Sequence, residues 1–385
     1  MNLIPKQSVG AITALVLGIS LTVGVSQKLV TAQAPVALSN NQKVEDVFLN
    51  IKSLRGQPAD MLNPTMVFFE AALGVGCPYC HDNDANKREL DSKPQKLIAR
   101  RMIDMVTSIN KETFNGARQV TCFTCHEGRS TPIGTPNVSG AELPRALGED
   151  YLATLPPPPP VPAISAGQVL DKYIAALGGA NALEKVPGLT AAGTVTQRRP
   201  GRDFPSTQIE IFSRVPGMGL SVTKAGQNDN LLSYGATGGW ARAGNAAPRD
   251  LRKAEADGTK LEDPFNLPAQ LKQTLIDAKL DHPDVIGNRE VYVITARTQN
   301  LPLVKAYFEK ESGMLARLVY YTDTPFGQYP TQIEYSDFRD VGGRKVPYQW
   351  VISQTRNREF TYAMQTVRAV AIEDARFAKP AATAR

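Results

Sequence analysis

The chain has 385 residues, a length that predicts two domains or one large one. With 42% hydrophobic and 21% charged residues, the composition excludes a chain that is disordered throughout and a membrane protein with many spans. The net charge of +6 is spread thinly, and no segment forms the clustered basic stripe that nucleic-acid binding requires. We therefore expect no nucleic-acid partner.

The first 34 residues have the pattern of a secretory signal peptide. Lys6 precedes an uncharged, mostly apolar run from Val9 to Val25, and a small-x-small sequence ends at Ala34, near which we expect cleavage. The alternative is an uncleaved single-span anchor, because the apolar run is near the lower limit for crossing hydrocarbon. We expect a periplasmic protein, and the alternative places it at the inner membrane.

Residues 35–142 have helical periodicity and few strand signals. Three helices are expected, over residues 44–54, from 63 to 74 or 76, and from 92 through 109. Asn63 is a favourable N-cap, and Pro64 fits the first helical turn, where its missing N–H costs nothing. We predict that this region forms an all-α domain.

Five consecutive prolines, Pro156 to Pro160, separate this region from the rest of the chain. Such a run favours an extended polyproline II spacer, so we place a linker at residues 143–165. A helical stripe follows over residues 169–177, another helix fits residues 267–280, and the remaining pattern alternates with period two. We expect residues 166–385 to form a mainly antiparallel β-domain with one or two helices. Strands are expected at residues 290–297, 314–321, 331–336, 345–353 and 359–370, with a tight hairpin turn at Gly342-Gly343.

Two pentapeptides carry the chemistry of the chain. Residues 77–81 (Cys-Pro-Tyr-Cys-His) and 122–126 (Cys-Phe-Thr-Cys-His) are both C-x-x-C-H, and they use every cysteine present. In this motif two thiols form thioethers to the vinyl groups of one haem, and the adjacent imidazole binds its iron. We predict two haem c groups, with thioethers from Cys77, Cys80, Cys122 and Cys125 and proximal iron ligands from His81 and His126.

Structural disulfides and zinc are the alternatives for the cysteines. Two disulfides are compatible with an oxidising compartment, but they do not require a histidine after each pair. A zinc site with four thiolate ligands would also leave both histidines unexplained. A thioredoxin-like dithiol is expected near a βαβ pattern, which this sequence lacks. Haem attachment is the interpretation that uses both cysteine pairs and both histidines.

Methionine is the expected second iron ligand at both haems. His282 is the one remaining histidine and lies in the predicted β-domain, so both haems cannot have two histidine ligands. Methionine is the usual alternative and raises the reduction potential relative to a second histidine. The helical region contains Met61, Met66, Met102 and Met105. We predict Met66 at the first haem and Met105 at the second, with Met102 as the alternative, and expect one of that pair to pack in the core.

The helical region resembles the cytochrome c subunit of photosynthetic reaction centres, in which a helix bearing methionine, a loop and C-x-x-C-H repeat in tandem. Residues 105–110 (Met-Val-Thr-Ser-Ile-Asn) and 120–128 (Val-Thr-Cys-Phe-Thr-Cys-His-Glu-Gly) are similar to that family's M-V-x-x-L/I-N and V-T-C-Y-T-C-H-x-G stretches. The resemblance covers residues 40–140, implies a redox role and favours Met105 over Met102. Reaction-centre members typically carry four haems, whereas this chain has sites for two, as do small relatives from non-phototrophic bacteria.

Residues 166–385 resemble, over fewer positions, the open half-barrel of outer-membrane lipoprotein carriers and sorting proteins (LolA-like). Residues 169–173 (Val-Leu-Asp-Lys-Tyr) lead to 176–179 (Ala-Leu-Gly-Gly), and the segments 333–338 and 345–347 resemble the late hairpins of that fold. The resemblance implies a curved sheet around an apolar cavity that accepts acyl chains. The alternative is a docking or anchoring module with a filled core.

These features predict an exported dihaem c-type cytochrome that passes single electrons between a donor and an acceptor in the periplasm or membrane, without bond-making catalysis. A dihaem peroxidase is one alternative, and it would need a haem with an open sixth position. The other alternative is a lipid or quinone carrier whose haems serve the bound ligand. In that case the β-domain would hold an apolar ligand or contact a membrane partner.

Overall fold

The structure is a computed structural model that describes residues 42–132, 160–199, 202–215, 217–226, 229–355 and 358–381. The expected signal peptide lies outside these residues, as do most of the predicted linker and four of its five consecutive prolines. No helix within the described ranges is both long enough and apolar enough to cross a membrane.

The first part of the chain is helical, as predicted. Its elements are α1 (Val44–Val47), η1 (Ala59–Met61), α2 (Leu62–Leu73), η2 (Cys77–Tyr79), η3 (Ala85–Lys87), α3 (Pro94–Thr113) and α4 (Cys122–His126). The predicted helix over residues 44–54 is wrong beyond its first turn, because Phe48 is extended (φ −113°, ψ 143°) and Asn50 has a left-handed φ of 56°. Asparagine tolerates this left-handed conformation better than most residues. Helix α2 ends where predicted, at Gly74, whose φ of 65° makes a left-handed C-cap.

The second part is one antiparallel sheet of 15 strands. The strands are β1 (Gly188–Arg199), β2 (Arg202–Asp203), β3 (Thr207–Arg214), β4 (Met218–Thr223), β5 (Asn230–Gly235), β6 (Gly238–Arg242), β7 (Arg249–Asp250), β8 (Ile276–Leu280), β9 (Asp284–Ile286), β10 (Arg289–Arg297), β11 (Val304–Glu309), β12 (Leu315–Thr324), β13 (Gly327–Val341), β14 (Arg344–Thr355) and β15 (Arg358–Ala369). The five predicted strands are confirmed, and so is the turn at Gly342-Gly343, where both φ angles are positive.

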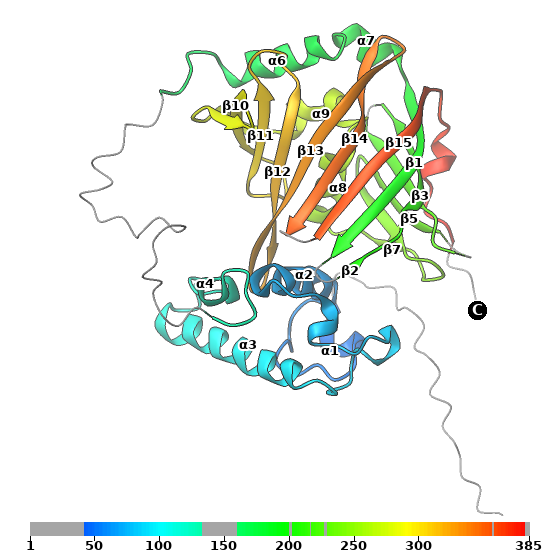
Figure 1. The fold of residues 1–385 in the computed structure, drawn as a ribbon. Coiled ribbons are helices and arrows are strands. Elements are labelled where there is room, and N and C mark those ends of the chain that lie inside the picture. Colours follow the sequence, from blue (N-terminus) through cyan, green and yellow to red (C-terminus); the bar gives the residue numbers. More distant parts are fainter. Residues whose placement is uncertain are drawn as a thin grey trace, which may run out of the picture. The chain divides into compact units, whose positions relative to one another are not determined.

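Two meanders make up this sheet. Its main path runs β7-β6-β5-β4-β3-β1-β15-β14-β13-β12-β11-β10-β8, while β2 pairs with β1 and β9 pairs with β10. The pairing of β1 with β15 joins the two halves, with Leu189 opposite Ala369. The path is open because β7 and β8 end it without pairing to each other, and Figure 1 shows β12 to β15 and β1 side by side.

Four α-helices accompany the sheet, where one or two were expected: α6 (Ala166–Ala176), α7 (Ala180–Lys185), α8 (Lys253–Glu262) and α9 (Leu267–Thr274). The predicted helix over residues 267–280 is wrong in its second half. Residues 276–280 (Ile-Asp-Ala-Lys-Leu) alternate in polarity and pair with β10 as strand β8. Helix α8 is missed because its sequence is largely charged and contains Gly258. That glycine lies against Tyr320, whose hydroxyl would be 3.0 Å from an added Cβ.

Two hydrophobic clusters position the helical region. The larger one joins the sheet to α6 and α9 through fully buried side chains such as Leu177, Leu271 and Ile333. The smaller one joins α2 and α3 to the β12–β13 hairpin, and its buried members are Val67, Phe68, Ala72, Ile103, Phe326 and Tyr329. Close packing leaves no room for a side chain at Gly327, where a Cβ would lie 2.3 Å from the ring of Phe68. Helix α2 is therefore held against the ends of the long strands (Figure 1).

Candidate haem site

Both C-x-x-C-H motifs fold into a single helical turn. Residues 77–79 form η2, and the backbone N–H of His81 donates to the carbonyl of Cys77 at 3.0 Å. The second motif is α4 itself, and Thr121 at its N-cap donates its backbone N–H to Thr124 Oγ1 at 3.0 Å. In each motif, the helical turn holds both cysteines and the histidine close together in one short segment.

The two histidines have the same hydrogen bond. His81 Nδ1 lies 2.9 Å from the carbonyl oxygen of Arg88, and His126 Nδ1 lies 2.9 Å from that of Arg129. Because a carbonyl oxygen only accepts, each Nδ1 must donate, and the neutral ring keeps its lone pair on Nε2. Such a bond fixes the orientation and tautomer of a metal-binding histidine. Burial also lowers the pKa of His81, which favours the neutral ring. Both histidines therefore fit an iron ligand.

All four cysteines are free thiols. Burial raises the pKa of Cys80 and raises the pKa of Cys122 to about 11, so both thiols are protonated at neutral pH. Within the described residues, no three His, Cys, Asp or Glu side chains converge as a metal ion would require. Thioether attachment to haem uses free thiols of this kind.

Met66 lies on the side of α2 that faces the first motif. Glu70 and Leu73 follow it at positions i+4 and i+7 and share its helical face. Glu70 in turn accepts a hydrogen bond from Cys77 Sγ at 2.8 Å. By contrast, Met61 Sδ accepts a hydrogen bond from Arg252 Nη1 at 2.7 Å and is engaged with the sheet region. Met66 thus shares the face of α2 that carries Glu70, whereas Met61 contacts the sheet region.

Met102 and Met105 are both exposed, to 36% and 43%. The core positions of α3 are Ile103 and Val106 instead, so neither methionine has the core-packing role expected for one of them. With Leu97 and Ile98 they form an exposed apolar stripe on α3. This exposed apolar stripe, with the sulfur atoms of Met102 and Met105 at one end, is suited to lie against the face of a porphyrin.

Two contacts that sequence reasoning missed fix the second motif. Asn110 at the end of α3 accepts from the N–H of Val120 at 2.9 Å and donates to its carbonyl at 2.7 Å. Gly128 donates its N–H to the carbonyl of Ala72 at 3.0 Å, and a Cβ at Gly74 would lie 2.1 Å from the oxygen of Gly128. Asn110 and Gly128 belong to the two stretches that resemble reaction-centre cytochromes, so the resemblance could have indicated that these residues matter.

The first motif is held differently, by a buried carboxylate of α2 and by two arginines of the sheet. Glu70 is 5% exposed, and its Oε2 accepts from Arg358 Nη1 at 2.8 Å. Arg199, the last residue of β1, places Nη1 4.0 Å from Cys77 Sγ. Burial raises the pKa of the Cys77 thiol, its hydrogen bond to Glu70 raises it further, and the charges of Arg199 and Arg88 oppose this rise.

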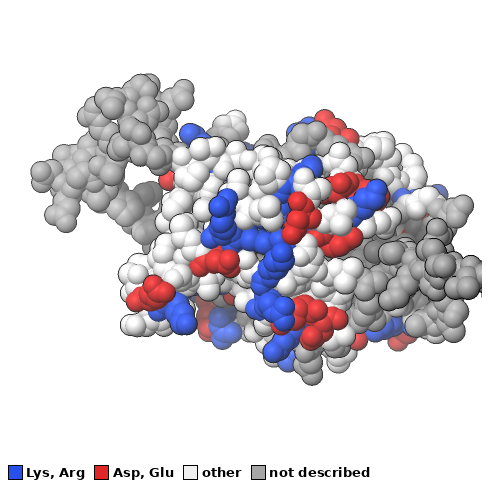
Figure 2. All heavy atoms as spheres, turned by 90° about the horizontal axis from the view of Figure 1, so that it is seen from below, with Lys and Arg blue, Asp and Glu red and all other residues white. Residues whose placement is uncertain are grey.

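Charges of both signs cover the face on the side of α3, seen in Figure 2. Asp91, for example, forms ion pairs with Lys52, Lys96 and Arg100 at 3.6, 3.5 and 2.8 Å. Arg100 is the main reason why the pKa of Asp91 is far below its usual range. Blue and red side chains alternate across this face, so its charge alone does not select an acidic or a basic partner.

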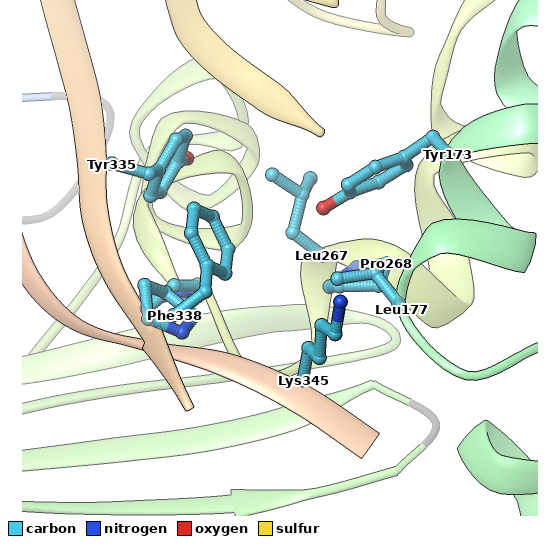
Figure 3. Close-up of a pocket in the computed structure, with 9 residues that line it drawn as sticks. Tyr173, Leu177, Leu267, Pro268, Tyr335, Phe338 and Lys345 are labelled. Atoms are coloured by element: carbon cyan, nitrogen blue, oxygen red, sulfur yellow. The ribbon is translucent and has the colours of Figure 1, made fainter. Parts of the chain in front are cut away.

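The sheet region contains a small pocket between α6, α9 and β13. Tyr173, Tyr335 and Phe338 approach it from two sides around Leu267 (Figure 3). Its volume is about 10 Å³, room for about one water molecule. An acyl chain or a quinone would fit here only if the core opened.

Residues 19–140 match the family of the photosynthetic reaction centre cytochrome c subunit. Such a subunit from Rubrivivax gelatinosus is 33% identical over 115 residues, which are 28% of this chain and 31% of that protein. Cytochrome c-554 from Chloroflexus aurantiacus is 32% identical over 95 residues, which are 23% of this chain and 20% of that protein. The matches confirm the predicted resemblance of the helical region, although this chain spans less than a third of each relative.

Comparison with solved structures gives matches that cover about half of this chain. A LolA superfamily protein from Nitrosomonas europaea covers 56% of this chain and 99% of its own, with 11% identity and a TM-score of 0.43. A lipoprotein-sorting protein domain from Vibrio parahaemolyticus covers 55% of this chain and 94% of its own, with 9% identity and a TM-score of 0.41.

Proposed function

We propose that this chain is an exported dihaem c-type cytochrome that carries single electrons between redox partners outside the cytoplasm. The observation that carries the proposal is the matched geometry of His81 and His126. Each donates Nδ1–H to a backbone carbonyl at 2.9 Å and keeps Nε2 for a metal. The match of residues 19–140 to reaction-centre cytochromes supports the same assignment.

Each predicted residue then has a stated role. The thiols of Cys77, Cys80, Cys122 and Cys125 would hold two haems, with His81 and His126 as proximal ligands. Met66 and Met105 would be the distal ligands, and Met102 remains the alternative to Met105. Haem supplies a reversible one-electron couple when bound. The chain's own part is to orient the ligands, through the carbonyls of Arg88 and Arg129, and to exclude water from one side of each motif.

We assign four segments to this function. Residues 1–34 would be the signal peptide, 35–142 the dihaem domain, 143–165 the linker and 166–385 the LolA-like sheet domain. The pocket between α6, α9 and β13 is too small for an acyl chain or a quinone, with a volume of about 10 Å³, and we therefore assign the sheet domain as a docking or anchoring module. The mature protein would work in the periplasm with an electron donor and an acceptor, either of which can be membrane-bound.

The test is to produce the full chain with its export signal and count its haems. We expect two covalent haems per chain by pyridine haemochrome, both low-spin, each taking up one electron in a redox titration. A paired Cys122→Ser and Cys125→Ser chain should retain one haem, and a paired Cys77→Ser and Cys80→Ser chain should retain the other. Absence of haem would overturn the proposal, and a high-spin haem that reacts with peroxide would favour a peroxidase instead.

A further inference from the structure

Charged side chains of the sheet meet at the first C-x-x-C-H motif. Glu70 connects them: one carboxylate oxygen accepts from Cys77 Sγ and the other from Arg358 Nη1, both at 2.8 Å. Arg199 Nη1 lies 4.0 Å from the same sulfur. Arg358 and Arg199 come from β15 and β1, strands that pair with each other. Two strand ends thus bring guanidinium groups to one cysteine.

This cluster has an excess of positive charge. Arg199 interacts with Arg358, Arg88 and Glu70, and Arg358 forms an ion pair with Glu70, so three cations and one carboxylate meet around Arg199. Burial is the main influence on Arg199 and lowers its pKa, and the positive charge of Arg358 acts in the same direction. The Nε of Arg358 is buried and has no hydrogen-bond partner. The cluster therefore contains more cationic charge than its own carboxylate neutralises.

The second motif has different surroundings. Cys122 packs against the apolar cluster that contains Phe326 and Tyr329 of the β12–β13 hairpin. Apart from burial, the ionisable group that affects the Cys122 thiol is Cys125. Near this motif, Arg118 forms an ion pair with the carboxylate of Asp323 in the sheet. Within the described residues, an arginine side chain hydrogen-bonds a cysteine at the first motif and not at the second.

We propose that Arg199 and Arg358 hold the first haem at a higher reduction potential than the second, so that the sheet sets the direction of electron transfer within the molecule. The inference rests on the proposed function, because it assumes that both motifs carry haem. The two arginines are positioning residues that act through their charge on a group held by Cys77 and His81.

The physical reason is the charge difference between the oxidation states. Ferric haem has one more positive charge than ferrous haem, so a nearby cation destabilises the ferric form and raises the potential. The effect is large where water is excluded, and the side chains of Arg358 and Glu70 are only 12% and 6% exposed. Electrons then pass from the second haem to the first.

The experiment is a redox titration of the full haem-loaded chain carrying Arg199→Gln. We expect one of the two midpoint potentials to fall and the other to stay. Glu70→Gln removes the opposing charge and should raise the same midpoint potential. The matched control is Arg198→Gln on the same strand, whose side chain is 62% exposed and should leave both midpoints unchanged. A chain with Cys122→Ser and Cys125→Ser identifies the first haem, because it retains that haem alone.

The proposal is established if the first haem has the higher midpoint in the unsubstituted chain and shifts in opposite directions in Arg199→Gln and Glu70→Gln, since a merely structural role would not reverse sign with charge. A first haem with the lower midpoint overturns it. Two normal haems whose midpoints do not move in Arg199→Gln overturn it. A shift confined to the second haem, or an equal shift in Arg198→Gln, also overturns it. A wild-type chain without two haems contradicts the proposed function instead, so the two failures are distinguishable.

Discussion

The two C-x-x-C-H motifs have the same histidine geometry and different supports. At the first motif, a buried carboxylate and two arginines from distant strands surround Cys77. At the second, the Asn110 side chain bonds both backbone groups of Val120 in the preceding loop, the Gly128 N–H donates to the carbonyl of Ala72 in α2, and the sheet contributes apolar contact. The repeated short motif therefore gives both sites the same local turn, while the surroundings of each site come from elsewhere in the chain.

The largest effect on a reduction potential should come from replacing a distal methionine, the ligand that both haem sites are expected to share. Met105→Ala should lower the potential of the second haem and abolish its weak far-red sulfur-to-iron band, because a thioether ligand favours ferrous iron. Absorption spectroscopy and a redox titration measure both effects. Met102→Ala is the matched control, since Met102 is exposed on the same face of α3. Loss of the band in Met102→Ala instead would reverse the assignment.

The next effect tests the charged support of the first motif. Glu70→Ala should lower the free energy of unfolding by about 3–5 kcal/mol, because it leaves Arg358 buried without its carboxylate. Urea denaturation of the haem-loaded protein measures the change. Asp104→Ala, at an exposed position of α3, should change it by less than about 0.5 kcal/mol. Equal stability of the two variants would show that the ion pair does not support the motif.

A third change tests the contact between α2 and the second motif. Gly74→Ala should cost about 1–3 kcal/mol, because a Cβ would lie 2.1 Å from the backbone oxygen of Gly128. Gly116→Ala is the control, since Gly116 also has a positive φ but has no atom within 4 Å of its Cβ position. Thermal unfolding compares the stability of the two variants. Equal losses would show that backbone strain at a positive φ, and not the contact with Gly128, causes the effect.

The smallest effect concerns the loop before the second motif. Asn110→Ala should cost about 1–2 kcal/mol, since it removes the hydrogen bonds to both backbone groups of Val120. Hydrogen exchange of the Val120 amide should become faster in this variant. Asn110→Asp keeps the acceptor oxygen and should preserve most of that protection. Unchanged exchange in Asn110→Ala would place the rigidity of the loop elsewhere.

Local patterns made much of the fold predictable. They predicted the end of α2 at Gly74 or Gly76 and the turn at Gly342-Gly343, because each depends on neighbours in sequence. The haem ligands that the motif spacing predicts stay a prediction. Helix α8 was missed since its stability comes from packing, with Leu261 fully buried, rather than from a clear apolar stripe. The contact of Glu70 with Arg358 was invisible because 288 positions separate the two residues.

The position of β15 has a consequence for the order of events during biogenesis. Strand β15 lies between β1 and β14, so the middle of the sheet cannot be completed until residues 358–369 are available. Contacts of such large sequence separation form slowly. If the chain is exported as we propose, Cys77 emerges well before Arg358 can bind Glu70 beside it. Haem attachment at the first motif would then precede completion of the sheet.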